Sequence, residues 1–188
     1  MRSFANLLLD RPLIMGIVNV TPDSFTDGGD FFDAATAIDH GKKLLADGAD
    51  ILDIGGESTR PGAQPVGSIA EAKRVLPVIE GLAKTGAVIS IDTRHADVMT
   101  SALDAGANIL NDVSALEGEG SLEVAAKSQA SIVLMHMQGE PATMMDNPVY
   151  ENVVDEVSSY LSERIDVCVA AGIDKARIAI DPGFGFGK

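Results

Sequence analysis

The sequence predicts an α/β fold, a parallel (β/α)8 barrel of which this chain carries about the first six β/α units. Short apolar runs alternate with helical stretches, and each apolar run ends in a polar residue. The carboxyl ends of parallel barrel strands are where such enzymes keep their chemistry. A doubly wound sheet would usually carry a glycine-rich turn after its first strand, and the turn at residues 19–23 contains no glycine. The barrel is therefore the favoured architecture.

The expected strands are short, apolar and bounded by Gly, Asp or Pro. They cover residues 14–20, 51–54, 88–91, 109–113, 132–137 and 178–180. Helical spacing of apolar residues occurs between them, for example at 34–45, 75–82 and 153–169. Residues 47–53 resemble residues 105–111, and in both a glycine ends a helix just before the next strand. These repeats predict one barrel domain over residues 1–188, incomplete at its C-terminal side because a full barrel needs eight units and about 250 residues.

The composition fits a folded protein without a membrane or secretion signal. Hydrophobic residues make up 46% of the chain and charged residues 22%, which allows a substantial core. No leader and no membrane-length apolar run is visible, so a cytoplasmic location is expected. Cys168 lies among apolar residues and is expected to be a buried, inert thiol. The net charge of −14 disfavours nucleic acid and anionic membranes, and an anionic substrate would need a metal ion or arginines.

Two segments are candidates for binding anionic groups. Asn19 ends the first strand, and its amide oxygen could hold a hard cation such as Mg²⁺, although alone it is more typical of a turn cap. Residues 55–62 place Thr59 and Arg60 in a loop rich in Gly and Pro, which suits carboxylate or phosphate oxygens. The density of Gly and Pro favours function over a plain surface loop.

Polar residues at later strand ends predict a site for a flat heterocycle. Asp92, Asn111 and Asp181 each end an expected strand, and together they offer acceptors and one amide donor. An aminopyrimidinone edge has the matching pattern. For Asp53 or Asp112 we favour the alternative that the side chain caps the following helix.

Three further features are less specific. His136 is interpreted as a hydrogen-bonded structural histidine. Met135 and Met137 are expected to pack in the core, although one of them could lie under a ring. Residues 183–188 suit an apolar flap over a substrate better than a phosphate loop, because phenylalanine occupies alternate positions.

Four motifs, in order along the chain, resemble those of the dihydropteroate synthase family. They are MGIVNVTPDSF at 15–25, GGESTRPG at 55–62, LMHMQG at 134–139 and DPGFGFGK at 181–188. The resemblance implies a pterin-binding (β/α)8 barrel that is a cytoplasmic transferase of folate biosynthesis. It would condense p-aminobenzoate with (7,8-dihydropterin-6-yl)methyl diphosphate, giving 7,8-dihydropteroate and pyrophosphate, and sulfonamides would compete with p-aminobenzoate.

The resemblance also implies roles for individual residues. Asn19 would bind Mg²⁺ and the diphosphate, and Asp92 and Arg60 would be catalytic. The pterin would be held by Asp92, Asn111, Asp181 and Met135. The p-aminobenzoate side would be formed by Thr59, Arg60, Pro61, Phe25 and Phe186. A homodimer is expected from the resemblance alone.

Family members continue beyond the GFGK segment to a pterin-binding lysine on the seventh strand and an Arg-x-His on the eighth, which this sequence does not contain. Lys188 belongs to the GFGK segment and is not expected to replace that lysine. Two alternatives stay open, a truncated non-catalytic pterin-binding product and a methyltetrahydrofolate methyltransferase-type pterin domain. The Thr59-Arg60-Pro61 loop and the first-strand motif favour the synthase over the methyltransferase.

Overall fold

The computed structural model describes residues 2–21, 34–58, 65–139 and 143–188. Its main feature is one parallel sheet of six strands in the order β3-β4-β5-β6-β7-β8, as the alternating pattern predicts. Phe25, Thr59, Arg60 and Pro61 lie outside the described residues. The strands are β3 Met15–Asn19, β4 Ile51–Gly55, β5 Val88–Asp92, β6 Ile109–Asp112, β7 Ser131–Met135 and β8 Ile178–Asp181.

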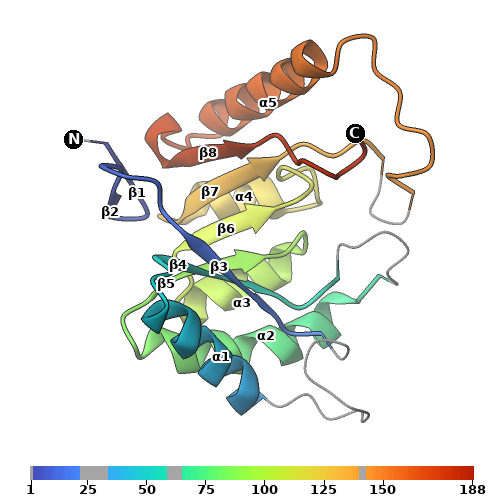
Figure 1. Ribbon diagram of the computed structural model, residues 1–188. Coiled ribbons are helices and arrows are strands. Elements are labelled where there is room, and N and C mark those ends of the chain that lie inside the picture. Colours follow the sequence, from blue (N-terminus) through green and yellow to red (C-terminus); the bar gives the residue numbers. More distant parts are fainter. Residues whose placement is uncertain (1, 22–33, 59–64, 140–142) are drawn as a thin grey trace.

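The helices lie on the outer side of the curved sheet (Figure 1). They are α1 Ala34–Ala46, α2 Ser68–Ala83, α3 Ala96–Ala105, α4 Ser121–Lys127 and α5 Val153–Ala170, with a 3₁₀ turn at Lys175–Arg177 before β8. Helix α2 starts earlier than predicted and continues through Pro77. Helix α3 ends at Gly106, whose φ of 112° is the left-handed conformation that glycine adopts at helix ends.

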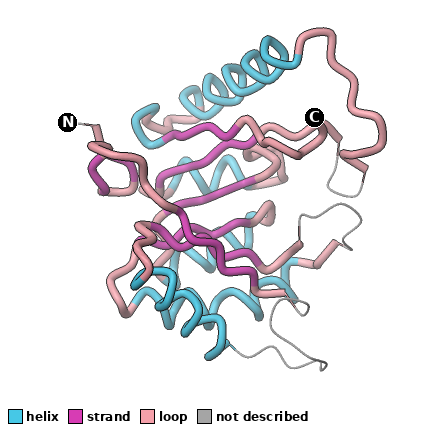
Figure 2. Tube along the Cα trace, in the orientation of Figure 1, coloured by secondary structure: helices cyan, strands magenta, loops and turns pink. Residues whose placement is uncertain are grey.

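A small antiparallel hairpin that the sequence did not predict precedes the barrel strands. Its strands are β1 Ser3–Phe4 and β2 Leu7–Leu8. The backbone N–H of Ala5 in its turn donates to Ser131 Oγ at 3.0 Å, at the start of β7. The hairpin therefore lies at the amino ends of the strands, and Figure 2 shows it on the side opposite the chain's C-terminus.

The hydrophobic core lies between the sheet and its helices. Alternate strand residues such as Leu52, Ile89 and Leu110 are fully buried there, and Ile79 and Met99 bury their side chains from α2 and α3. The opposite face of the sheet lines the interior of the curve, where the side chains of Asn19, Asp53, Asp92 and Asn111 lie, as the strand register requires. Helices cover the outer face and leave the inner face for chemistry.

The outermost strands of the sheet each have one strand neighbour among the described residues. Ile17 on β3 is 57% exposed and Ile180 on β8 is 52% exposed, whereas most apolar residues of the central strands are buried. Within the described residues we find no helix that combines the length and apolarity needed to cross a membrane.

Candidate active site

Four strand ends meet at one level on the inner face of the sheet. In the parallel register Asn19 is paired with Gly55, Gly55 with Asp92, and Asp92 with Asn111. Further along the sheet Met135 is paired with Asp181. The structure thus confirms that the residues predicted to meet at the strand ends share one face, because a parallel sheet brings all its carboxyl ends to the same edge.

Gly55 keeps a space open between two of these polar groups. A methyl group at this position would lie 3.4 Å from Asp92 Oδ2 and 3.9 Å from Asn19 Oδ1. Glycine therefore leaves room for a third group between the amide of Asn19 and the carboxylate of Asp92. The neighbouring Gly56 points to the other face, where a methyl group would meet Glu71 Cγ and Val75 Cγ1 at 2.8 Å.

Asp92 is partly exposed at the mouth of the site, and its charge is nevertheless strongly disfavoured. Burial raises the pKa of Asp92 well above its ordinary value, and the carboxylates of Asp53, Glu71, Asp112 and Glu57 raise it further. An acid held in this way can keep a proton or stabilise positive charge placed beside it. Such a group is typical of an active site rather than of a helix cap.

Asp53 lies one layer deeper on the same face, paired in register with Ser90. It is 6% exposed, and its Oδ2 accepts a hydrogen bond from Asn111 Nδ2 at 3.1 Å. Burial raises the pKa of Asp53, and the side chains of Ser90 and Asn111 offset only part of this shift. The interpretation of Asp53 as a helix cap is therefore wrong, because the strand continues two residues past it and turns its side chain inward.

Asp112 does not cap the following helix either, because α4 begins at Ser121 with Gly120 as its N-cap, and it stabilises a turn instead. The side chain of Asp112 faces away from the interior. Its Oδ1 accepts hydrogen bonds from Ser114 N at 2.8 Å and from Ser114 Oγ at 2.7 Å. Its Oδ2 accepts from Leu116 N at 3.0 Å. Asp112 holds the turn after β6, so two aspartates that look alike in sequence have opposite roles.

Asp181 and Met135 complete the polar row at the last two strands. Asp181 Oδ1 accepts from Gly183 N at 2.7 Å, which orients the carboxyl group at the end of β8. Met135 is 4% exposed and is paired with Asp181 in the register. The carboxylate and the thioether are thus neighbours on the inner face.

Lys188 is engaged with backbone oxygens and is not available to a substrate in this structure. Its Nζ donates to the carbonyl oxygens of His136, Gly183 and Phe186 at 3.1, 2.9 and 3.0 Å. This supports the expectation that Lys188 is not a pterin-binding lysine. Phe184 in the same segment is 88% exposed, and Phe186 is partly buried.

His136 lies on the outer face beneath α5, against Tyr160 in an edge-on contact with ring centroids 5.0 Å apart. Its Nδ1 is buried and has no hydrogen-bond partner in the part of the chain that the structure describes. The ring packs as expected of a structural histidine, but the predicted hydrogen bond is not found at Nδ1 within the described residues. Cys168 is buried and free, as expected.

A salt bridge fixes both ends of the segment that follows β4. The Glu57 carboxylate accepts hydrogen bonds from Arg94 Nε and Nη2 at 3.0 Å each. Its Oε1 also accepts a hydrogen bond from Val66 N at 2.8 Å. Burial acts to raise the pKa of Glu57, but the hydrogen bonds from Arg94 and Val66 outweigh it and the net shift is downward. This bridge ties residues 57 and 66 together beside β5, and the residues predicted to bind substrate at 59–61 lie between them.

Behind that bridge Glu71 is fully buried on α2. Its Oε2 lies 3.0 Å from Thr93 Oγ1, which donates to it, and 2.7 Å from His95 Nδ1. Burial raises the pKa of Glu71, and His95 and Thr93 oppose this. The contacts join α2 to the turn after β5 and so support the position of Asp92.

The oxygen ligands available near Asn19 suit a metal ion that retains most of its coordinated water molecules. No group of three or more His, Cys, Asp or Glu side chains that could enclose a metal occurs among the described residues. Asn19 supplies one oxygen next to the space that Gly55 leaves open. Mg²⁺ commonly takes only one or two protein oxygens together with water and substrate phosphates. The residues present therefore fit the Mg²⁺ expected at Asn19.

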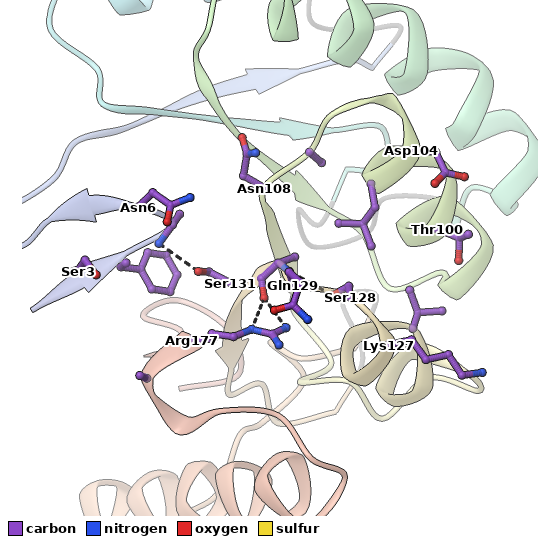
Figure 3. Close-up of a pocket in the computed structure, with 17 residues that line it drawn as sticks. Ser3, Asn6, Thr100, Asp104, Asn108, Lys127, Ser128, Gln129, Ser131 and Arg177 are labelled. Atoms are coloured by element: carbon purple, nitrogen blue, oxygen red, sulfur yellow. Dashed lines mark hydrogen bonds between the residues drawn. The ribbon is translucent and has the colours of Figure 1, made fainter.

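A large cavity lies away from these residues, at the amino ends of the strands (Figure 3). It has a volume of about 1040 Å³ and lies between the hairpin and the ends of α3 and α4. Arg177 at its edge is already bound, because its Nε and Nη2 donate to the carbonyl oxygen of Ala130 at 2.9 and 2.6 Å. In barrel enzymes this end serves stability, so we place the active site at the carboxyl ends instead.

Comparisons with known proteins show which proteins this chain resembles. The chain is 54% identical to the dihydropteroate synthase of Neisseria meningitidis serogroup C over 183 residues, which is 96% of this chain and 65% of that protein. A Yersinia pestis dihydropteroate synthase solved with a sulfonamide drug is 47% identical, with a TM-score of 0.91 over 97% of this chain and 66% of that chain. A Xanthomonas albilineans dihydropteroate synthase solved with 4-aminobenzoic acid is 54% identical, with a TM-score of 0.88 over 96% of this chain and 64% of that chain.

The chain thus spans about 65% of the length of the first curated relatives it matches. The family described as "Pterin binding enzyme" matches residues 15–188, from the first residue of β3 to Lys188. The same residues contain every polar group of the strand-end row described above. The chain therefore belongs to the pterin-binding enzyme family.

Proposed function

We propose that the protein carrying this chain is a dihydropteroate synthase. It joins p-aminobenzoate to (7,8-dihydropterin-6-yl)methyl diphosphate and releases pyrophosphate. The observation that carries the proposal is the row of Asn19, Asp92 and Asn111 at one level of the sheet, with Asp181 on the same face. The relatives named as dihydropteroate synthases support the choice of reaction.

The strand-end row suits the pterin ring. A carboxylate accepts hydrogen bonds from adjacent N–H groups, and Asp92 and Asp181 offer such oxygens from two sides of the site. Asn111 adds an amide, and Met135 offers a polarisable surface for a flat ring. We assign pterin binding to these residues, because a ring carrying both donors and acceptors needs both kinds of partner.

The reaction breaks the C–O bond between the pterin methylene and the diphosphate, and it forms a C–N bond to the arylamine, which loses a proton. As the diphosphate leaves, positive charge develops on the pterin, and the Asp92 carboxylate stabilises it. When bound, Mg²⁺ would neutralise the leaving diphosphate, with Asn19 as its protein ligand. Gly55 leaves the space between Asn19 and Asp92 in which these groups must meet.

We assign p-aminobenzoate to the loop side of the site. Thr59, Arg60 and Pro61 would contact it from the segment whose ends Glu57 holds, with Phe25 and Phe186 nearby. Arg60 would also favour an anionic substrate in a protein whose net charge is −14. Both substrates would thus be small molecules, and the expected homodimer stays a prediction that sedimentation would test.

The test is a reconstitution of the reaction with the protein expressed from its complete reading frame. We expect equimolar dihydropteroate and pyrophosphate from the two purified substrates, and competition by a sulfonamide against p-aminobenzoate. Pterin binding without turnover would indicate the non-catalytic alternative. Methyl transfer from methyltetrahydrofolate would indicate the methyltransferase alternative. Either result would overturn the proposal.

A further inference from the structure

Asp53 is a buried carboxylate that the proposed reaction does not use. It lies on β4, one layer below the row of strand-end residues, and is almost entirely shielded from solvent. Its Oδ1 has no hydrogen-bond partner among the described residues, and neither has the nearby Ser90 Oγ. Among the described residues no cation offsets its burial, which raises the pKa of Asp53. A carboxylate kept at this cost calls for a role beyond packing.

A hydrogen bond from Asn111 connects Asp53 to the proposed pterin site. Asn111 Nδ2 donates to Asp53 Oδ2 at 3.1 Å from β6, across the intervening strand β5. Asp53 Oδ2 can accept this hydrogen bond in both protonation states, provided that the proton of the neutral acid is on Oδ1. The bond therefore does not depend on the charge of Asp53.

This contact decides which end of the Asn111 amide is offered to a ligand. Amide oxygen and nitrogen are nearly equal in size, so shape alone does not select one orientation. An acceptor below the amide selects the orientation in which the nitrogen points down. The oxygen, which diverges from the same carbon, is then left for a donor on the ligand.

We infer that Asp53 is a positioning residue for pterin recognition, which locks the Asn111 amide so that it presents an oxygen to a ring N–H. This inference rests on the proposed function and deepens it, because it assigns the chemical identity of one contact. It predicts that the site discriminates against rings that carry an acceptor at that position. A buried donor–acceptor mismatch is the physical basis of such selectivity.

Two substitutions of Asp53 test whether its role depends on the acceptor oxygen, on the negative charge or on the size of the side chain. Asp53→Asn keeps an oxygen of the same size that can accept from Asn111, and it removes the charge. Asp53→Leu keeps the approximate volume and removes the acceptor. The matched control is Asp50→Asn, at the position just before β4. The Asp50 carboxylate accepts hydrogen bonds from Arg11 and from Ile14 N at 2.8 Å each.

The first measurement is calorimetric titration with (7,8-dihydropterin-6-yl)methyl diphosphate, on the protein from its complete reading frame. We expect Asp53→Asn to bind within about threefold of wild type and Asp53→Leu to bind at least about tenfold more weakly. Asp50→Asn should lower the Tm without changing the affinity. Equal affinity of Asp53→Leu and wild type would overturn the inference, as would an equal loss in both Asp53 variants.

The second measurement needs no substrate. The side-chain amide of Asn111 can be followed by ¹⁵N NMR after selective asparagine labelling, with Asn111→Ala to assign its signal. Wild type and Asp53→Asn should show slow exchange of this amide with water, and Asp53→Leu should show fast exchange. Slow exchange in Asp53→Leu would refute the lock. If wild type binds no pterin, the proposed function fails, whereas the amide signal still tests the lock itself.

Discussion

Replacing Asp92 with asparagine should make the protein more stable and less active at neutral pH. Asp92 and Asp53 are diagonal neighbours on adjacent strands, because Asp53 is paired with Ser90. Side chains at this offset lie roughly 7 Å apart. Two full charges at that separation, with an effective dielectric constant of about 20, repel by about 2 kcal/mol. Asparagine keeps the shape of the side chain and removes this repulsion.

The sign of the effect with pH follows from the direction of the pKa shift. Burial and neighbouring carboxylates raise the pKa of Asp92 in the folded protein. In the unfolded chain the carboxyl ionises near pH 4. The contribution of Asp92 to stability is therefore fully present below about pH 4, and it is lost as the pH rises through the folded-state pKa. The gain from Asp92→Asn should be near zero at pH 4 and should grow toward pH 7.

Urea unfolding followed by circular dichroism at pH 4, 5.5 and 7 measures this gain. We expect up to about 2 kcal/mol at pH 7, equivalent to a Tm increase of roughly 4 to 8 °C. The same substitution should lower kcat by about 100-fold and change pterin affinity much less, because the charge acts on the developing cation. A loss confined to KM would contradict that role.

The matched control is Asp112→Asn, which alters another buried aspartate whose pKa is raised by burial. One of its oxygens accepts from Leu116 N, and an amide nitrogen in that place would face another N–H. We expect Asp112→Asn to destabilise the fold by about 1 to 2 kcal/mol. If Asp92→Asn is less stable than wild type at pH 7, or its gain does not vary with pH, the electrostatic reasoning is refuted.

Four further outcomes are expected. Asp181→Asn should weaken pterin binding by on the order of 2 to 4 kcal/mol, because an amide N–H would face a ring N–H, and unchanged affinity in calorimetry would remove Asp181 from the site. Gly55→Ala should leave the Tm unchanged but lower kcat/KM at least about tenfold, because the added methyl group would fill the space beside Asn19. Gly56→Ala should instead lower the Tm, because its methyl group would meet side chains of helix α2 at 2.8 Å. Chelation of Mg²⁺ should stop pyrophosphate release, and full activity in excess chelator would exclude the metal assignment. A polypeptide limited to residues 1–188 should give no turnover and should associate in sedimentation, because within the part of the chain that the structure describes β3 and β8 each have one edge without a strand neighbour. A soluble monomer with turnover would contradict this.

The order of the strands could be predicted because each is a short apolar run closed by a polar residue. Their ends were less predictable. The run at 132–137 was expected to be one strand, but β7 ends at Met135, which places His136 just past the strand and under α5. The hairpin at residues 3–8 escaped prediction because strands of two residues carry no alternation.

The site was predicted where a polar residue ended a strand, and it was missed where the polar residue lay inside one. A cap of the following helix was one interpretation of Asp53, which lies next to the last residue of the strand expected at 51–54. The strand continues to Gly55, so Asp53 belongs to the inner face. Since both faces of a barrel strand can be apolar, the sequence does not show which face an aspartate takes. The register with Ser90 and the bond from Asn111 decide it.

The acids of the inner face support a catalytic interior, although two of the buried atoms left unsatisfied within the described residues, Glu71 Oε1 and His136 Nδ1, lie on the outer side of the sheet. Two of the four buried side-chain atoms without a partner among the described residues, Asp53 Oδ1 and Ser90 Oγ, lie on the inner face, directly below Asp92. On the outer face Asp112 is bonded through both oxygens. A fold selected only for stability would neutralise or pair the inner acids, because unpaired buried carboxylates cost free energy. On the inner face these carboxylates lie where they would stabilise a cationic transition state. Such an arrangement is expected of a preorganised active site.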